Sequence, residues 1–126
     1  LLSAHHLDGH AGFRSLASDL GSRLLRAWRQ GPLPHELVNL LTGEVGEQDA
    51  NLGSSLAEVG TIQLEMTSLS AVLGDSVYYW RGEHAMDLMV SLLDEAGGLL
   101  PIMLRAAPPM QWTNMRVTLG GRGDSF

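Results

Sequence analysis

Apolar side chains recur at intervals of three and four residues along two neighbouring segments of the chain, residues 52–80 and 83–96. This spacing places them on one face of an α-helix, which makes 3.6 residues per turn. Each segment therefore predicts an amphipathic helix, and the short stretch between them predicts an antiparallel helical hairpin. The two apolar faces consist of Leu52, Val59, Ile62, Met66, Leu69, Leu73, Val77 and Trp80, and of Ala85, Met86, Met89, Leu92, Leu93 and Ala96.

The predicted turn of this hairpin combines aromatic residues with a glycine. We expect Tyr78 and Trp80 to anchor the turn in the core. Gly82 suits the end of the first helix, because glycine adopts the left-handed conformation at little cost. The same three residues are therefore predicted as interaction residues if the hairpin pairs with another protein.

The remaining chain is predicted to form shorter elements around the hairpin. Residues 13–30 have a helical apolar face, although Gly21 weakens such a helix by about 1 kcal/mol relative to alanine. Short helices are expected at 35–41 and 99–107, between turns rich in glycine and proline. The fold class is therefore mainly α, a small helical bundle centred on an antiparallel hairpin. We divide the chain into an N-terminal arm (1–12), a helical domain (13–107) and an extended C-terminal tail (108–126).

Polar and apolar residues alternate along residues 111–119, which predicts a single strand. The sequence offers this strand no partner within the chain, and an unpaired strand is a template for pairing with another chain. We therefore expect Trp112, Met115 and Val117 to contact a neighbouring protein, in a homo-oligomer or in a larger complex.

The charge and composition exclude several classes of function. The formal net charge of −6 argues against a nucleic-acid-binding protein, which needs a cationic surface. The chain has no cysteine, so it has neither disulfides nor a thiolate metal site. No apolar run approaches the roughly 18 residues that span a membrane. The ends are basic and the middle is acidic, which fits either packing within one chain or head-to-tail contact between copies.

The histidines near the N-terminus are the residues best suited to bind a metal ion. His5, His6, Asp8 and His10 are of the right ligand types. No second cluster with matching spacing completes a site, although His35 or His84 could. We therefore interpret these histidines as solvent-exposed residues on an arm and not as metal ligands. The sequence therefore predicts no metal, no cofactor and no catalytic residues.

The segment Leu73-Gly74-Asp75-Ser76-Val77 resembles the first block of the GDSL (SGNH) hydrolases. The resemblance implies an esterase in which Ser76 attacks the ester carbonyl. That family also carries a late Asp-x-x-His, which does not follow Ser76 here. The surrounding helical period favours a helix kink instead, with Asp75 or Ser76 capping the next helix.

The tripeptide Trp80-Arg81-Gly82 resembles the Trp-x-Gly turn of the WXG family of type VII secretion substrates, which are helical hairpins that pair into four-helix bundles. The resemblance covers residues 52–106 and implies a secreted pairing protein. Members also carry a Tyr-x-x-x-Asp/Glu signal after the second helix, whereas no tyrosine follows Tyr79 here.

The tripeptide Arg122-Gly123-Asp124 resembles the integrin-binding loop of adhesive extracellular and viral surface proteins. It lies between glycine and serine near the end of the chain, where we expect a flexible segment. The resemblance implies adhesion through these three residues.

Taken together, the two helical faces, the unpaired strand and the lack of a catalytic set favour a non-enzymatic structural or assembly subunit that binds other proteins. A secreted helical hairpin and an adhesion protein remain the alternatives, with a GDSL-like esterase as a more remote one.

Overall fold

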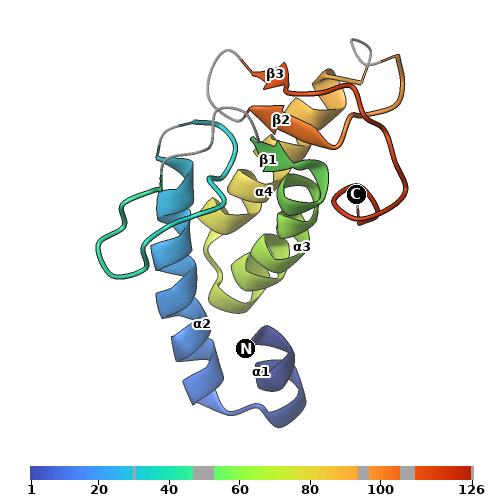
Figure 1. Ribbon diagram of the computed structural model, residues 1–126. Helices are drawn as coiled ribbons and strands as arrows, with labels where there is room; N and C mark the ends of the chain where they lie inside the picture. The colour runs from blue at the N-terminus through green and yellow to red at the C-terminus, as the bar shows by residue number, and fades with distance from the viewer. Residues whose placement is uncertain (30, 47–52, 94–96, 106–109, 126) are drawn as a thin grey trace.

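The computed structural model describes residues 1–29, 31–46, 53–93, 97–105 and 110–125. These ranges are mainly helical with a small sheet (Figure 1), which confirms the prediction of a mainly α fold. The elements in chain order are α1 (Leu2–Asp8), α2 (Ala11–Leu24), the 3-10 helix η1 (Leu25–Trp28), β1 (Ser54–Ser55), α3 (Leu56–Leu73), α4 (Ser76–Ser91), β2 (Met103–Arg105) and β3 (Gln111–Trp112).

Helices α3 and α4 form an antiparallel hairpin, but its turn lies earlier in the chain than predicted. Gly74 ends α3 in the left-handed conformation, with φ 73°. Asp75 then caps α4, accepting a hydrogen bond of 3.0 Å from the backbone N–H of Val77. The expected turn at residues 80–82 is wrong, because two residues with strong end-of-helix chemistry already reverse the chain at 74–75.

Gly82 is therefore not a helix terminator but a buried residue inside α4. A Cβ atom at this position would lie 2.9 Å from Cα of Gln63 on α3. The missing side chain allows the two helices to approach each other. Trp80 projects outward from the same helix and is 64% exposed, so it does not anchor the core as expected.

Helix α2 packs beside this hairpin, as Figure 1 shows, and continues into η1, so the predicted helix at 13–30 is largely confirmed. Its Gly21 is buried, and a Cβ there would clash with Cδ2 of Leu69 and lie 3.1 Å from the ring of Tyr78. The glycine that weakens α2 locally thus permits its packing. The buried cluster in this region consists of Ala17, Ala27, Trp28, Met66, Leu69 and Tyr78.

The sheet at one end of the hairpin has the order β1-β2-β3, and both pairs are antiparallel (Figure 1). Ser54 pairs with Leu104, which in turn pairs with Trp112. The strand predicted at 111–119 is therefore confirmed only for Gln111–Trp112, and it has a partner within its own chain. The helix predicted at 99–107 is wrong for Met103–Arg105, because these apolar residues are the central strand.

Two further local predictions are wrong. Residues 35–41 form no helix, because the side-chain oxygen of Asn39 accepts hydrogen bonds from the N–H groups of Leu41 and Thr42 and stabilises a turn. Residues 1–12, which we expected to be an extended or mobile arm, contain the helix α1, and Gly9 ends this helix at φ 70°. The division of the chain into arm, helical domain and tail stays a prediction.

Three arginines, one each in α2, in η1 and directly after η1, hold the segment that follows. Their side chains donate to backbone carbonyls 14 to 17 residues further along the chain, and planar guanidinium groups suit such multiple contacts. The pairs are Arg23 with Leu40 at 2.9 Å, Arg26 with Thr42 at 3.0 Å and Arg29 with Gly43 at 3.5 Å. Separately, none of the helices in the described ranges is both long and apolar enough to cross a membrane.

Candidate functional site

The last described residues form a turn, residues 120–125, that lies against the first turn of α3. The backbone N–H of Ala57 donates to the carbonyl oxygen of Arg122 at 2.9 Å. Within the turn, the N–H of Gly123 donates to the carbonyl of Gly120 at 3.1 Å. The turn is thus attached to the start of a long helix and is not the flexible end that the sequence suggested.

Steric demands fix the conformation of this turn. Arg122 has a backbone φ of 75°, a conformation that residues other than glycine rarely adopt. Its guanidinium approaches the sulfur of Met103 on β2 at 3.6 Å. A Cβ on Gly123 would lie 2.6 Å from the carbonyl oxygen of Thr118 and 2.8 Å from Cγ2 of Ile102. An unusual backbone held by neighbours is typical of functional sites.

Asp124 extends from this fixed turn into solvent. The described part of the chain gives its carboxylate no ion pair and no hydrogen-bond donor. Carboxylates that are held in place but left unpaired can act as general acids or bases. Asp124 is therefore the candidate catalytic residue of this site.

The neighbouring start of α3 is a complete capping box. The Ser55 hydroxyl accepts from the N–H of Glu58 at 3.2 Å, and the Glu58 carboxylate accepts from the N–H of Ser55 at 2.8 Å. Both serines of β1, Ser54 and Ser55, are buried. The sequence interpretation missed these residues, although the Ser-x-x-Glu pattern before an apolar run is a recognisable sign of a helix start.

Of the nine predicted interaction residues, the turn brings together Arg122, Gly123 and Asp124. Tyr78 and Gly82 lie within the helical core, away from the turn, and burial, with a contribution from Asp75, raises the pKa of Tyr78. The exposed Trp80 packs its edge against Tyr79, with ring centroids 5.2 Å apart.

Of the three residues predicted to make contacts from the C-terminal strand, only Trp112 lies in the sheet. Trp112 is in β3, and its buried indole nitrogen has no hydrogen-bond partner among the described residues. Met115 and Val117 are exposed, at 69% and 47%. Contact between these residues and another protein stays a prediction.

The other chemistry considered from the sequence finds no support in the geometry. Ser76 is the first residue of α4, after a helix rather than a strand, so it does not lie on a hydrolase nucleophile turn. Within the described ranges, no three histidines or carboxylates gather where they could hold a metal ion. Arg23 holds the pKa of Asp19 below its ordinary value by a hydrogen bond, but this exposed pair lies on α2, away from the turn.

Comparison with known proteins adds independent information. The sequence model of glycosyl hydrolase family 47 matches residues 1–126. The endoplasmic reticulum mannosyl-oligosaccharide 1,2-alpha-mannosidase of Homo sapiens is 35% identical over 128 residues, covering 100% of this chain and 18% of that protein. Human mannosyl-oligosaccharide 1,2-alpha-mannosidase IB is 37% identical over 130 residues, covering 100% and 20%.

A plant protein and these human proteins give the same result. The mannosyl-oligosaccharide 1,2-alpha-mannosidase MNS1 of Arabidopsis thaliana is 36% identical over 134 residues, covering 100% of this chain and 23% of the plant protein. The chain therefore spans about a fifth of the length of the curated relatives that it matches.

These matches show that the predicted function is wrong. The relatives are glycosidases, so a non-enzymatic structural or assembly subunit is contradicted, as are the secreted hairpin, the adhesion protein and the esterase. The error has a physical origin. The turn at residues 120–125 looks flexible in a sequence rich in glycine, and its attachment to α3 depends on a contact across more than half of the chain.

Proposed function

Because the chain belongs to glycosyl hydrolase family 47, we propose that it forms part of an enzyme that hydrolyses α-1,2-linked mannose in mannosyl-oligosaccharides. The observation that carries this proposal is the turn at residues 120–125, which presents the unpaired carboxylate of Asp124 beside the start of α3.

Under this proposal the helical hairpin is part of a larger helical barrel and not of a free-standing bundle. The family has an α/α-barrel architecture, in which helical hairpins are arranged around a common axis. We propose that α3 and α4 form one such hairpin. The first turn of α3 then supports the site, and the length of the relatives leaves room for further hairpins.

The chemistry of glycoside hydrolysis explains why a fixed carboxylate matters. Most glycosidases place two carboxyl groups on either side of the scissile bond, one as acid and the other as base or nucleophile. Asp124 supplies one of these groups. The carbonyl of Arg122 positions it by accepting the N–H of Ala57, and Gly123 allows the close packing against Ile102. Glu58, whose carboxylate accepts the Ser55 N–H, maintains the helix start that the turn binds.

Asp124→Asn tests the proposal, since asparagine keeps the shape of the side chain but removes its charge and its ability to transfer a proton. We expect kcat for release of mannose from an α-1,2-linked mannobiose to fall by about 10²–10⁴-fold. The value of KM should change much less, because substrate contacts are retained.

Asp19→Asn is the matched control. Asp19 lies on α2 and pairs with Arg23 at 2.9 Å, away from the turn. This variant should hydrolyse the substrate at nearly the wild-type rate. Wild-type turnover by Asp124→Asn would show that Asp124 is not part of the catalytic pair.

A further inference from the structure

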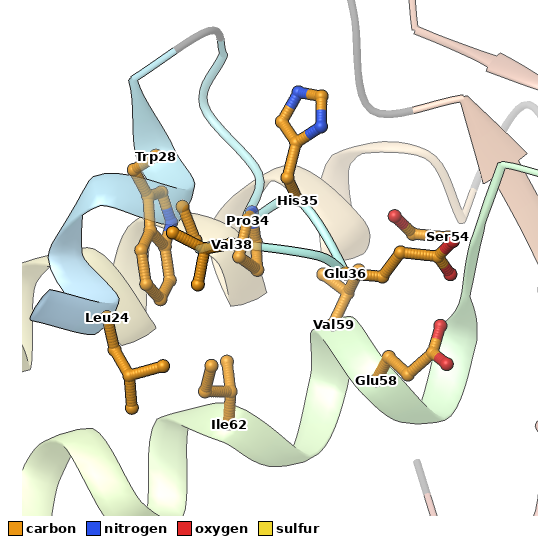
Figure 2. Close-up of a pocket in the computed structure, with 11 residues that line it drawn as sticks. Leu24, Trp28, Pro34, His35, Glu36, Val38, Ser54, Glu58, Val59 and Ile62 are labelled. Carbon is orange, nitrogen blue, oxygen red and sulfur yellow. The ribbon is translucent and has the colours of Figure 1, made fainter. Parts of the chain in front are cut away.

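A small pocket lies between η1, the segment that follows it and the first two turns of α3 (Figure 2). Its volume is about 240 Å³. Pockets for drug-sized ligands measure about 300–1,000 Å³, so this one has room for a single ring. No residue of the turn at 120–125 lines the pocket, although Ser54 and Glu58, at the helix start that the turn contacts through Ala57, line it.

One wall of the pocket contains a hydrogen-bond donor without a partner among the described residues. Trp28 is 4% exposed, and its indole nitrogen is buried without a hydrogen bond to any of them. Figure 2 shows this nitrogen on the edge of the ring that faces Val38, inside the group of lining residues. Buried polar groups in folded proteins are nearly always paired, so an unpaired donor in a pocket indicates an acceptor that binds there.

The opposite wall provides hydrogen-bond acceptors. Figure 2 shows the carboxylates of Glu36 and Glu58 on the side near Ser54, across the pocket from Trp28. One oxygen of Glu58 accepts the Ser55 N–H. Glu36 has no hydrogen bond or ion pair with any described residue. A ligand would therefore meet the unpaired indole N–H of Trp28 and at least one unused carboxylate.

The surface between the two polar walls is apolar, formed by Leu24, Pro34, Val59 and Ile62. A suitable ligand must therefore combine apolar faces with groups that both donate and accept hydrogen bonds at its edge. A sugar ring has this combination, because its hydroxyls do both and its C–H groups form apolar faces. An anion would be repelled by the carboxylates, and a simple ammonium ion would leave the indole N–H unpaired.

We propose that this pocket binds one neutral sugar ring, with Trp28 donating to a hydroxyl oxygen and Glu36 accepting from a hydroxyl group. This is a second carbohydrate site, lined by η1, the segment that follows it and α3, with no residue of the turn that carries Asp124. A site of this kind would hold a further sugar of an oligosaccharide substrate. The class of ligand follows from the pocket itself, whereas the choice of a mannoside as the probe rests on the proposed function.

Nuclear magnetic resonance tests the proposal on the 126-residue chain. Its three tryptophans give three indole N–H signals, and Trp28→Phe identifies the signal of residue 28. Methyl α-D-mannopyranoside is the probe, and cyclohexanol is the control ligand of similar ring size with a single hydroxyl. We expect a saturable shift of the Trp28 signal with the mannoside and no comparable shift with cyclohexanol.

Variants locate the binding, with the methyl signals of Ile62 as the reporter that all of them retain. Trp28→Phe and Glu36→Gln should each weaken binding by about five- to tenfold, the usual effect of losing one hydrogen bond to a ligand. Trp80→Phe is the matched control on an exposed tryptophan and should bind like the wild type. Circular dichroism checks that each variant keeps its helices, and Glu36→Gln remains informative if Trp28→Phe unfolds.

Three results would overturn the proposal: no saturable shift with the mannoside, equal shifts with cyclohexanol, or equal weakening in Trp80→Phe. The outcome is independent of catalysis. Asp124→Asn is read by turnover, so a bound mannoside with an active Asp124→Asn enzyme would reject the proposed catalytic role and keep the pocket.

Discussion

Single residues set how closely the helices of this protein approach, and two glycines have the main role. Gly21 on α2 faces Leu69 and Tyr78, and Gly82 on α4 faces the backbone of Gln63. The close approach that these glycines allow depends on neighbours from other parts of the chain. Local helix propensity therefore describes these positions as weak points, while the packing requires them.

Gly82→Ala separates these two effects. Alanine is the better helix former by about 1 kcal/mol, but overpacking a core costs about 1–3 kcal/mol. The contact at 2.9 Å is to a backbone atom, which cannot rotate away. We therefore expect a net loss of about 1–2 kcal/mol in the free energy of unfolding, measured by urea denaturation.

The exposed Arg81→Ala, next to Gly82 on α4, is the control, and it should leave stability nearly unchanged. A Gly82→Ala protein that is more stable than the wild type would show that α3 and α4 can move apart without cost.

At the scale of elements, the start of α3 links the fold to the candidate site. The capping box of Ser55 and Glu58 satisfies the N–H groups of these two residues. Between them, the N–H of Ala57 donates to the carbonyl of Arg122. Loss of the capping box should therefore also weaken the attachment of the turn that carries Asp124.

Ser55→Ala should lower the free energy of unfolding by about 1 kcal/mol, the usual effect of losing an N-cap side chain. The N–H of Ala57 should also exchange with solvent deuterium faster than in the wild type, because the first turn of α3 frays. Hydrogen exchange followed by nuclear magnetic resonance measures this difference.

Ser68→Ala is the control on the exposed side of the same helix, where the hydroxyl only bonds back to the carbonyl of Leu64. Its effect should be close to zero. Unchanged exchange at Ala57 in Ser55→Ala would show that the turn alone protects this N–H.

The elements that could be predicted from the sequence are those with several helical turns. The apolar faces of α2, α3 and α4 identify three helices, although the turn at Gly74 and Asp75 shifts two of their ends. The strands are two or three residues long, too short for an alternating pattern to appear. Met103–Arg105 belong to an apolar run that fits a helix or a strand equally well, and only pairing with Ser54 and Trp112 decides between them.

The candidate site could be predicted only in part, for a related reason. Arg122, Gly123 and Asp124 were identified as a motif, but for adhesion, because exposure near a chain end indicated flexibility. The contacts with Ala57, Ile102 and Met103 that hold the turn come from distant segments. A pattern of neighbouring residues in the sequence cannot predict contacts between such distant segments.

At the scale of the whole molecule, many large apolar side chains among the described residues are exposed. The most exposed are Leu7, Leu41, Leu99, Met115 and Leu119, the last at 93%. Each such side chain leaves apolar surface in water that contact with another molecule would bury. We therefore expect the isolated chain to associate with itself as its concentration rises.

Light scattering over a concentration series measures this association. The average mass should increase with concentration, and replacing Leu41 and Leu119 by serine should reduce the increase. Replacing the exposed polar Asp87 by serine is the control and should leave the mass curve unchanged. A constant monomer mass at all concentrations would contradict the expectation.

The hydrogen bond between Ala57 and Arg122 also has a consequence for the order in which the protein folds. Bringing together segments that lie far apart in the sequence costs more chain entropy than closing short loops. Arg23, Arg26 and Arg29 donate to carbonyls no more than 17 residues away, and α3 packs against the helix that directly follows it. The turn with Asp124, in contrast, must find a partner across more than half of the chain. We therefore expect it to dock late, so that folding intermediates contain the helices but lack the carboxylate of Asp124 in its native position.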